Sequence, residues 1–388
     1  MHVALAAIFF FALITYVVPA MWPASVFQLG TFILSAFALF RGLPRFAWPM
    51  VPLTFAIFWG LLQLVTGHTA NAYETKTDIV NWTTFLAVFL AGVCLFRDSS
   101  VRRWFRHALV WFGFFVSVVA IIQICTSDDV PFWSTPLIGY VIGPLVSRNH
   151  FAAFIELVFP IALYESLQGE RDSLLYSGVA AVMYASLVAS ASRAGALLCT
   201  SELLLVVLVA WIRGRANSRE VGGTLFRILL LFALFTTIMG WNAVWARFWA
   251  PDPMAFRREF YIASLHIVDA HPWFGTGLGT WATVYPRWAI VDSGWFANQA
   301  HNDWLQWAAE GGIPFCVMLS TLFVWAVPAV FRNLWGLGVI AVFLHALVDY
   351  PFSRPTLAAW PFLILAMLAA SKNSSDETNA ELEPSPES

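Results

Sequence analysis

The amino-acid sequence predicts an all-α, polytopic membrane protein with about twelve transmembrane helices and one long, partly helical extracytoplasmic loop. Hydrophobic residues make up 60% of the 388 residues and charged residues only 11%, whereas about a quarter of the residues in a soluble domain are charged. A soluble globule of this size could not bury so much apolar surface, so most of the chain must lie in lipid.

The predicted spans follow from the apolar runs, because a transmembrane helix needs about 20 mostly apolar residues. These runs are residues 3–20, 23–40, 46–65, 79–96, 107–126, 150–167, 174–191, 195–212, 223–241, 313–331, 336–352 and 355–371. The first two form a predicted hairpin rather than a signal peptide, because no basic residue precedes them. Residues 1–370 are therefore one predicted transmembrane domain, and the polar, acidic segment 371–388 is a predicted disordered tail.

Basic residues set the predicted orientation, because cytoplasmic loops carry an excess of Lys and Arg. Loops on one side hold Arg41, Arg45, Arg97, Arg102, Arg103, Arg106, Arg171, Arg213, Arg215, Arg219, Arg332 and Lys372, and short loops on the other side hold Lys76, Arg148, Arg193 and Arg354. Both termini are therefore predicted to lie in the cytoplasm, and the long segment 241–312 outside it.

The segment 241–312 holds nine of the twenty tryptophans, a residue that prefers the membrane–water interface. Its apolar spacing predicts a helix over 254–270 and a second over roughly 299–310, which carries His301 and Asn302 in its first turn and stops at Gly311–Gly312. Glycines at 275, 277 and 279 predict a turn between them. A phosphate-binding loop is the less favoured interpretation of these glycines, because no strand precedes them.

Ionisable side chains near membrane depth are costly and are candidates for function. Arg193 lies at the predicted outer end of a span, where it either binds an anion or anchors the helix at the interface. Arg257 and Arg258 are adjacent on the amphipathic helix, so one can face inward while the other meets solvent or lipid head groups. His301 is the candidate base, because only histidine titrates unperturbed near neutral pH.

Three carboxyl groups fall within predicted spans, at Glu156, Glu202 and Asp349. Asp349 follows His345 by one helical turn, so these two side chains can pair. The three carboxyls either form a proton path, as a transporter would need, or lock helices together through hydrogen bonds. The second interpretation is favoured. The four cysteines include no CxxC pair, which argues against a disulfide framework or a metal site.

Several segments, taken in order, resemble one known family. They are Ser147–Phe154 (SRNHFAAF), Ser192–Gly195 (SRAG), Arg257 with Tyr261, Asp269–Gly277 (DAHPWFGTG), Ala300–Gln306 (AHNDWLQ) followed by Glu310–Pro314 (EGGIP), and His345–Pro351 (HALVDYP). This series, over about residues 140–355, resembles the O-antigen ligase and O-antigen polymerase family of polytopic glycosyltransferases. Ala194 departs from the family pattern, in which glycine is common at that place.

The resemblance implies transfer of a glycan from a polyprenyl-diphosphate carrier to an acceptor hydroxyl, at the outer face of the bacterial inner membrane and without a metal or other cofactor. Segment 241–312 is then a periplasmic loop. The implied partners are this donor, a glycan or lipid-anchored acceptor and membrane lipids, and no nucleic acid is expected. His301 matches the catalytic histidine, and Arg193 and Arg257 match diphosphate-binding arginines. The predicted supporting residues are Asn149, Asn302, Arg258, His345 and Asp349.

Two other functions stay open from the sequence. A secondary transporter of a small anion such as bicarbonate would use the outer arginines and the carboxyls within the spans, although no inverted repeat is visible. A non-catalytic scaffold of an envelope-assembly complex would need neither His301 nor the arginines. Within the enzyme interpretation, a ligase and a polymerase differ only in the acceptor, which is a lipid-anchored core or a second lipid-linked repeat.

Overall fold

The computed structural model of the chain describes residues 1–18, 20–126, 142–168, 170–214, 218–239, 255–290, 294 and 296–382. Its elements are α1 (His2–Ile14), η1 (Thr15–Val17), α2 (Trp22–Arg41), α3 (Met50–Thr66), α4 (Ala72–Leu95), α5 (Ser99–Thr126), α6 (Arg148–Ser166), α7 (Glu170–Ala189), α8 (Arg193–Ile212), α9 (Ser218–Met239), α11 (Ala255–Ala270), α12 (Trp281–Val284), η2 (Tyr285–Arg287), α13 (Asp303–Arg332), η3 (Leu334–Gly336), α14 (Gly338–His345), η4 (Pro351–Ser353) and α15 (Pro355–Leu382). The described part of the chain contains no β-strand, so the predicted all-α class is confirmed.

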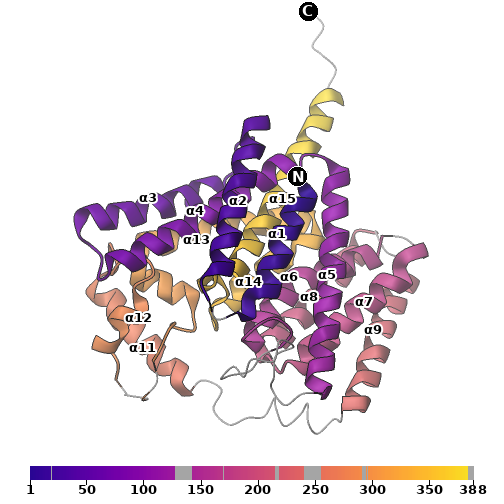
Figure 1. The fold of residues 1–388 in the computed structure, drawn as a ribbon. Helices are drawn as coiled ribbons and strands as arrows, with labels where there is room; N and C mark the ends of the chain where they lie inside the picture. The colour runs from indigo at the N-terminus through magenta and orange to yellow at the C-terminus, as the bar shows by residue number, and fades with distance from the viewer. Residues whose placement is uncertain are drawn as a thin grey trace, which may run out of the picture.

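Two helices form the centre of the bundle. Nearly all of α6 between His150 and Leu163 is buried, and so is α15 from Thr356 to Ala370. Helix α6 packs against α7, α8 and α14, while α15 packs against α4 and, less extensively, against α1 and α14. These two helices therefore join the α3–α4–α13 flank of the molecule to the α5–α7–α9 flank (Figure 1).

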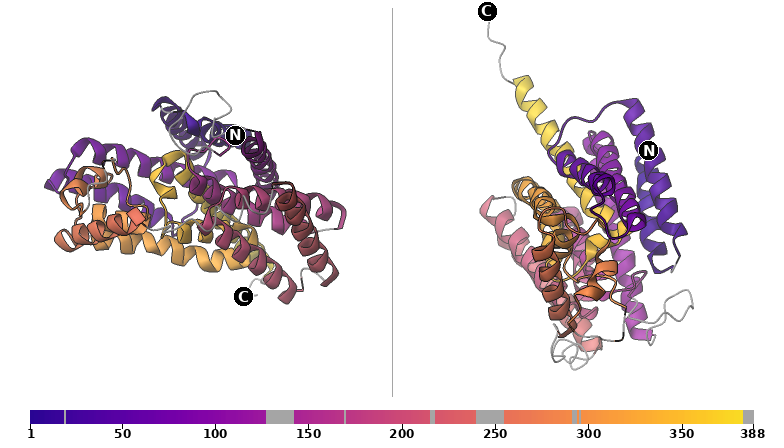
Figure 2. Two further views of the ribbon diagram at one scale, coloured as in Figure 1. Left: turned by 90° about the horizontal axis from the view of Figure 1, so that it is seen from below. Right: turned by 90° about the vertical axis from the view of Figure 1, so that its left-hand side faces the viewer.

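Six helices of the described chain are long and apolar enough to cross a membrane. They are α2, α4, α5, α8, α13 and the part of α7 from Asp172, and five shorter apolar helices accompany them. Every predicted span overlaps a helix, but the total number of crossings remains a prediction. The N-terminus and the last turns of α15 lie toward the top of Figure 1, whereas α11 and α12 lie toward the bottom, and the right-hand view of Figure 2 shows the same order.

Two predicted boundaries differ from the structure. The predicted span 336–352 is divided into η3, the short helix α14, a turn and η4, since proline at 351 disfavours helical backbone at the residue before it. Helix α15 continues to Leu382, whereas residues 371–388 were predicted to be disordered. Residues 383–388 lie outside the described part of the chain, as does much of segment 241–312 before α11.

The described part of segment 241–312 folds around a small apolar core of its own. Side chains of α11, α12 and the start of α13 form this core, which is centred on Trp281. Its indole donates a hydrogen bond to Ser264 Oγ at 2.8 Å. Helix α11 packs directly against α13, so the predicted amphipathic helix is confirmed as Ala255–Ala270.

The predicted glycine turn is the joint that fixes this segment to the bundle. Gly275, Gly277 and Gly279 all have positive φ, at 66°, 106° and 77°, which glycine adopts without steric cost. Gln63 of α3 donates to the carbonyls of Phe274 and Glu310 and accepts from Leu278 N. These contacts hold the turn rather than a phosphate.

The neighbouring carboxylate of Glu310 completes the joint. It accepts hydrogen bonds from Gly279 N at 3.0 Å and from Trp281 N at 3.1 Å. Helix α13 breaks just beyond it, where Gly312 has φ 78° and ψ 173°. The predicted stop at Gly311–Gly312 is therefore present as a kink, and the chain continues as the second half of α13.

Replacement of Gly275 by alanine should destabilise the protein. A Cβ atom at this position would lie 2.3 Å from the carbonyl of Glu310, at a positive φ that alanine adopts poorly. We expect a loss of at least about 2 kcal/mol, seen as a lower thermal unfolding temperature in lipid nanodiscs. Gly178→Ala is the matched control, because a Cβ atom there meets nothing within 4 Å. Equal unfolding temperatures for the two variants would contradict this account of the joint.

Candidate functional site

The backbone at His301 is strained. His301 has φ 55°, and Ala191 has φ 56°; these are the two non-glycine residues with positive φ in the described chain. A residue with a Cβ atom in this conformation costs about 1–3 kcal/mol and persists only where its surroundings hold it. The two residues stand in or directly before the AHNDWLQ and SRAG segments, so the strain coincides with two of the predicted functional motifs.

The prediction that His301 and Asn302 lie in the first turn of a helix is wrong. Helix α13 begins at Asp303, and Asn302 is its N-cap, with Oδ1 accepting from Leu305 N at 3.0 Å. His301 lies outside the helix because an N-cap residue leaves the helical conformation. The strained turn is held by Tyr261, whose hydroxyl donates to His301 O at 2.9 Å, and by Gln306, whose Oε1 accepts from Ala300 N at 3.0 Å.

The imidazole of His301 is both oriented and accessible. Its Nδ1 lies 3.2 Å from Asp349 Oδ1, and its side chain is 31% exposed. The ring stacks on Phe260 with a centroid distance of 5.8 Å and meets Tyr350 edge to face at 4.7 Å. An aspartate on Nδ1 favours the tautomer with the proton on that nitrogen, which leaves Nε2 as the acceptor of a proton.

Asp349 joins His301 to Arg257. Arg257 Nη2 lies 3.7 Å from the same Oδ1 atom, and Arg257 Nη1 donates to Val348 O at 2.8 Å. Burial by itself raises the pKa of Asp349, but the hydrogen bond with His301 and the nearby positive charges outweigh burial and lower that pKa to about 2. Asp349 lies in the turn after α14 and stays ionised at neutral pH, so it can interact with His301 and Arg257 at once.

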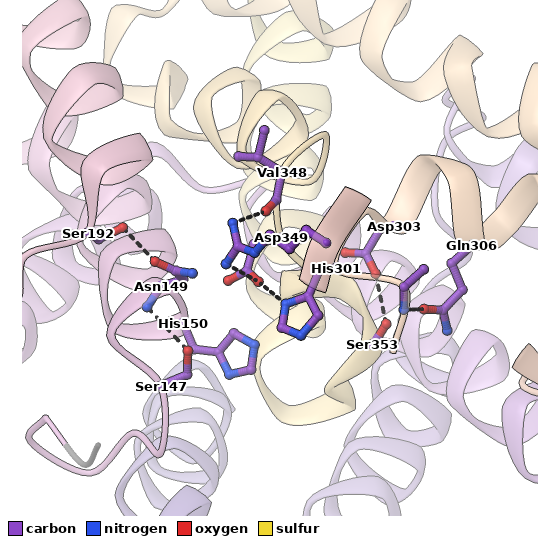
Figure 3. Close-up of polar contacts among 12 residues, drawn as sticks. Ser147, Asn149, His150, Ser192, His301, Asp303, Gln306, Val348, Asp349 and Ser353 are labelled. Atoms are coloured by element: carbon purple, nitrogen blue, oxygen red, sulfur yellow. Dashed lines mark hydrogen bonds and ion pairs between the residues drawn. The ribbon is translucent and has the colours of Figure 1, made fainter. Parts of the chain in front are cut away.

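Arg193 is the first residue of α8, and in Figure 3 the residue before it, Ser192, lies beside Asn149, with Asp349 between this pair and His301. Ser192 caps this helix and also donates to Asn149 Oδ1 at 2.9 Å. The close approach of α8 to α6 depends on Gly195, where a Cβ atom would lie 2.5 Å from the Cβ of Ala152. This packing brings the first turns of α6 and α8 together.

Aromatic rings connect the α6 end to His301. His150, which follows Asn149, meets Tyr350 edge to face at 4.7 Å, the same distance that separates Tyr350 from His301. Tyr16 of η1 lies within 2.7 Å of His150 Nδ1. Motifs that are more than 100 residues apart in the sequence therefore meet around Tyr350.

The surroundings of two predicted supporting residues, His345 and Arg258, do not include His301. The predicted pairing of His345 with Asp349 is wrong: His345 Nδ1 lies 2.7 Å from Glu156 Oε1, and both side chains are buried. Because α14 ends at His345 and the chain turns, Asp349 faces His301 and Arg257 instead. Arg258 is exposed, whereas its neighbour Arg257 is partly buried against Asp349.

Several residues of the site were not predicted from the sequence. Asp303 accepts from Phe352 N and from Ser353 Oγ, each at 2.8 Å, and so fixes η4 beside His301. Tyr350 and Gln306 were also missed as parts of the site, although both lie inside quoted motifs. Tyr16 carries no local signal, since its partner His150 is 134 residues away. Within the described residues, no group of three or more His, Cys, Asp or Glu side chains is arranged to hold a metal ion.

Comparison with protein families matches residues 178–320 to the family described as O-antigen ligase. The matched segment includes Arg193, Arg257 and His301. Residues 178–320 are similar to the O-antigen ligase family. The resemblance seen in the motifs is therefore confirmed over this part of the chain. No curated protein and no solved structure matches the chain significantly. The O-antigen ligase match and the apolar helices support a multi-pass membrane protein that takes part in glycan transfer during surface polysaccharide assembly.

The stability of variants at His301 should depend on how well the new residue adopts a positive φ. His301→Gly relieves the backbone strain, whereas His301→Ala keeps it, so the glycine variant should be the more stable of the two by about 1 kcal/mol. Thermal unfolding of both variants in lipid nanodiscs measures the difference. An alanine variant as stable as the glycine variant would show that the left-handed backbone at 301 is not maintained.

Proposed function

We propose that the protein transfers a glycan from a polyprenyl-diphosphate carrier to an acceptor hydroxyl at the outer face of the bacterial inner membrane, with both chain termini in the cytoplasm. The reaction is a metal-independent direct displacement with inversion at the anomeric carbon. The observation that carries this proposal is the triad of His301, Asp349 and Arg257, in which one buried carboxylate orients both a base and a guanidinium.

In the proposed reaction His301 Nε2 takes the proton of the acceptor hydroxyl as that oxygen attacks the anomeric carbon. The bond between the anomeric carbon and the diphosphate oxygen breaks, and the carrier diphosphate leaves with the bonding electrons. Asp349 stabilises the imidazolium that forms, because its carboxylate stays ionised beside Nδ1. The proton then passes from His301 to water or to the released diphosphate, which restores the base.

The arginines bind the donor in this proposal. A guanidinium has five N–H donors, and the contacts of Arg257 to Val348 and Asp349 leave some of them for phosphate oxygens. Arg193 provides a second positive charge at the start of α8, where the helix N-terminus adds partial positive charge. Both groups offset the charge that grows on the leaving diphosphate. The acceptor is either a lipid-anchored glycan, as for a ligase, or a second lipid-linked repeat, as for a polymerase.

His301→Ala should abolish transfer while the protein still inserts and folds. Loss of a general base typically lowers the rate by about 10²- to 10⁴-fold. The measurement is product formation by the purified protein in proteoliposomes with lipid-linked glycan and acceptor. His266→Ala is the matched control, because His266 is exposed on α11 and touches neither Asp349 nor His301 in the described structure. Normal transfer by the His301 variant would leave a scaffold as the better interpretation.

Arg193→Ala and Arg257→Ala should each raise the KM for the donor more than the KM for the acceptor. Loss of a charge-assisted hydrogen bond costs about 1.5–3 kcal/mol, which corresponds to roughly a 10- to 100-fold change. Initial rates at varied donor concentration, with the acceptor saturating, give this change. Arg287→Ala is the matched control, because Arg287 is an exposed arginine of the same outer segment. An unchanged donor KM in both site variants would contradict diphosphate binding.

A further inference from the structure

A cavity of about 220 Å³ is lined in part by Gln306 and Ser353, which lie on one side of His301 (Figure 3). Its walls come from the first three turns of α4, from Gly279 and Ala282 after the glycine turn, from residues 298–299, and from the start of α13 with η4. None of the residues in the triad lines it. This cavity is therefore separate from the proposed donor site.

The cavity walls combine flat rings with hydrogen-bonding groups. Trp82, Trp307 and Phe352 contribute buried aromatic surface, and such surface packs against the apolar face of a sugar ring. Asn81, Asn298, Gln299 and Gln306 contribute amides. Gln299 Oε1 is buried and has no hydrogen-bond partner among the described atoms, so this amide has an acceptor that a ligand hydroxyl could satisfy.

The ionisable side chains of the cavity, apart from Tyr73, are all carboxylic acids. Glu74, Asp78 and Glu310 line it, and no Lys, Arg or His is among the described lining residues. A diphosphate would meet only carboxyl groups there, whereas Arg257 and Arg193 lie elsewhere. Carboxyl and amide groups suit the hydroxyls of a neutral sugar or the ammonium group of an amino sugar. The chemistry of the cavity thus favours an uncharged or basic sugar over any anion.

Gln306 contributes both to the cavity wall and to the turn that holds His301. Gln306 lines the cavity and accepts from Ala300 N at 3.0 Å, directly before His301. Gln306 also donates to Glu310 Oε1 at 3.0 Å, so both side chains are preorganised. Figure 3 shows Gln306 and Ser353 on one side of His301 and Asn149 and Ser192 on the other. His301 therefore lies between the cavity and the helix start that carries Arg193.

We propose that this cavity binds the sugar of the acceptor, a neutral or amino sugar, and presents its hydroxyl toward His301. The identification of this sugar as the acceptor rests on the proposed glycan transfer. Sugar binding at the cavity, however, can be measured without any transfer. In this proposal the donor diphosphate lies on the side of His301 that holds the arginines. The acceptor sugar lies on the other side, in the cavity lined by carboxylic acids.

Binding is tested with the full chain in lipid nanodiscs, which avoids detergents with sugar head groups. The probes are N-acetylglucosamine, glucosamine and glucuronate, followed by saturation-transfer NMR. We expect the first two to bind the wild-type chain and glucuronate to bind at least about tenfold more weakly. Gln299 and the exposed Tyr73 both line the cavity. Gln299→Ala and Tyr73→Ala remove an amide and a ring from its wall with little loss of packing, and each should weaken sugar binding several-fold. Gln168→Ala, an exposed amide outside the cavity, is the control. Equal binding of glucuronate, or unchanged binding by both wall variants, would overturn the proposal.

Transfer kinetics separate this inference from the proposed function. In the wall variants the KM for the acceptor should rise by about tenfold, as expected for a lost hydrogen bond or stacking contact, with the donor KM unchanged. A raised donor KM with an unchanged acceptor KM would overturn the acceptor assignment and leave glycan transfer intact. Absence of transfer by the wild-type chain, together with sugar binding that depends on Gln299 and Tyr73, would overturn the transfer function and retain the sugar site.

Discussion

The buried carboxylate of Asp349 is the interaction on which the rest of the site depends. A carboxylate removed from water costs several kcal/mol unless charged partners and hydrogen bonds surround it. Asp349 is almost fully buried, and His301 and Arg257 supply those partners from two different segments. The requirement to neutralise one charge therefore fixes the relative positions of the α11 helix, the turn before α13 and the turn after α14. A neutral residue at 349 would leave His301 and Arg257 without the carboxylate that they share.

The two strained backbone positions of the described chain lie directly before the helices that carry residues of the proposed site. His301 and Ala191 hold left-handed conformations next to the N-caps Asn302 and Ser192. In both cases the strained residue ends one segment and the next residue starts a helix, so the turn directs the following side chains toward the centre of the site. Such strain persists only with support, which Tyr261 and Gln306 provide at His301. The supports are as much a part of the site as the histidine that they position.

Whether the sequence predicts a contact of this site depends on how far apart the two partners lie along the chain. The helices, the glycine turn and the amphipathic α11 follow from local periodicity and from residues with special backbone preferences, and they were predicted. Asp349 was predicted as a supporting residue but with the wrong partner, because its helix ends at His345 and no local signal shows which distant segment lies opposite. The contacts of Tyr16 with His150 and of Gln63 with the glycine turn also join distant segments. The acidic cavity was not predicted, because its walls come from α4, the glycine turn, α13 and η4, which only the fold brings together.

The distribution of charge around His301 gives a physical reason for the order of the segments. An enzyme that joins two glycans must hold two similar sugars without exchanging them, and shape alone discriminates poorly between similar rings. In the proposed reaction the arginines on one side attract the phosphorylated carrier, while the cavity on the other side, lined by Glu74, Asp78 and Glu310, offers a diphosphate no positive charge among its described residues. Where the acceptor is a lipid-anchored glycan without a carrier diphosphate, that group is the feature that distinguishes the two substrates. In the proposed reaction, an acceptor hydroxyl approaches His301 from the cavity side and meets the anomeric carbon held on the arginine side.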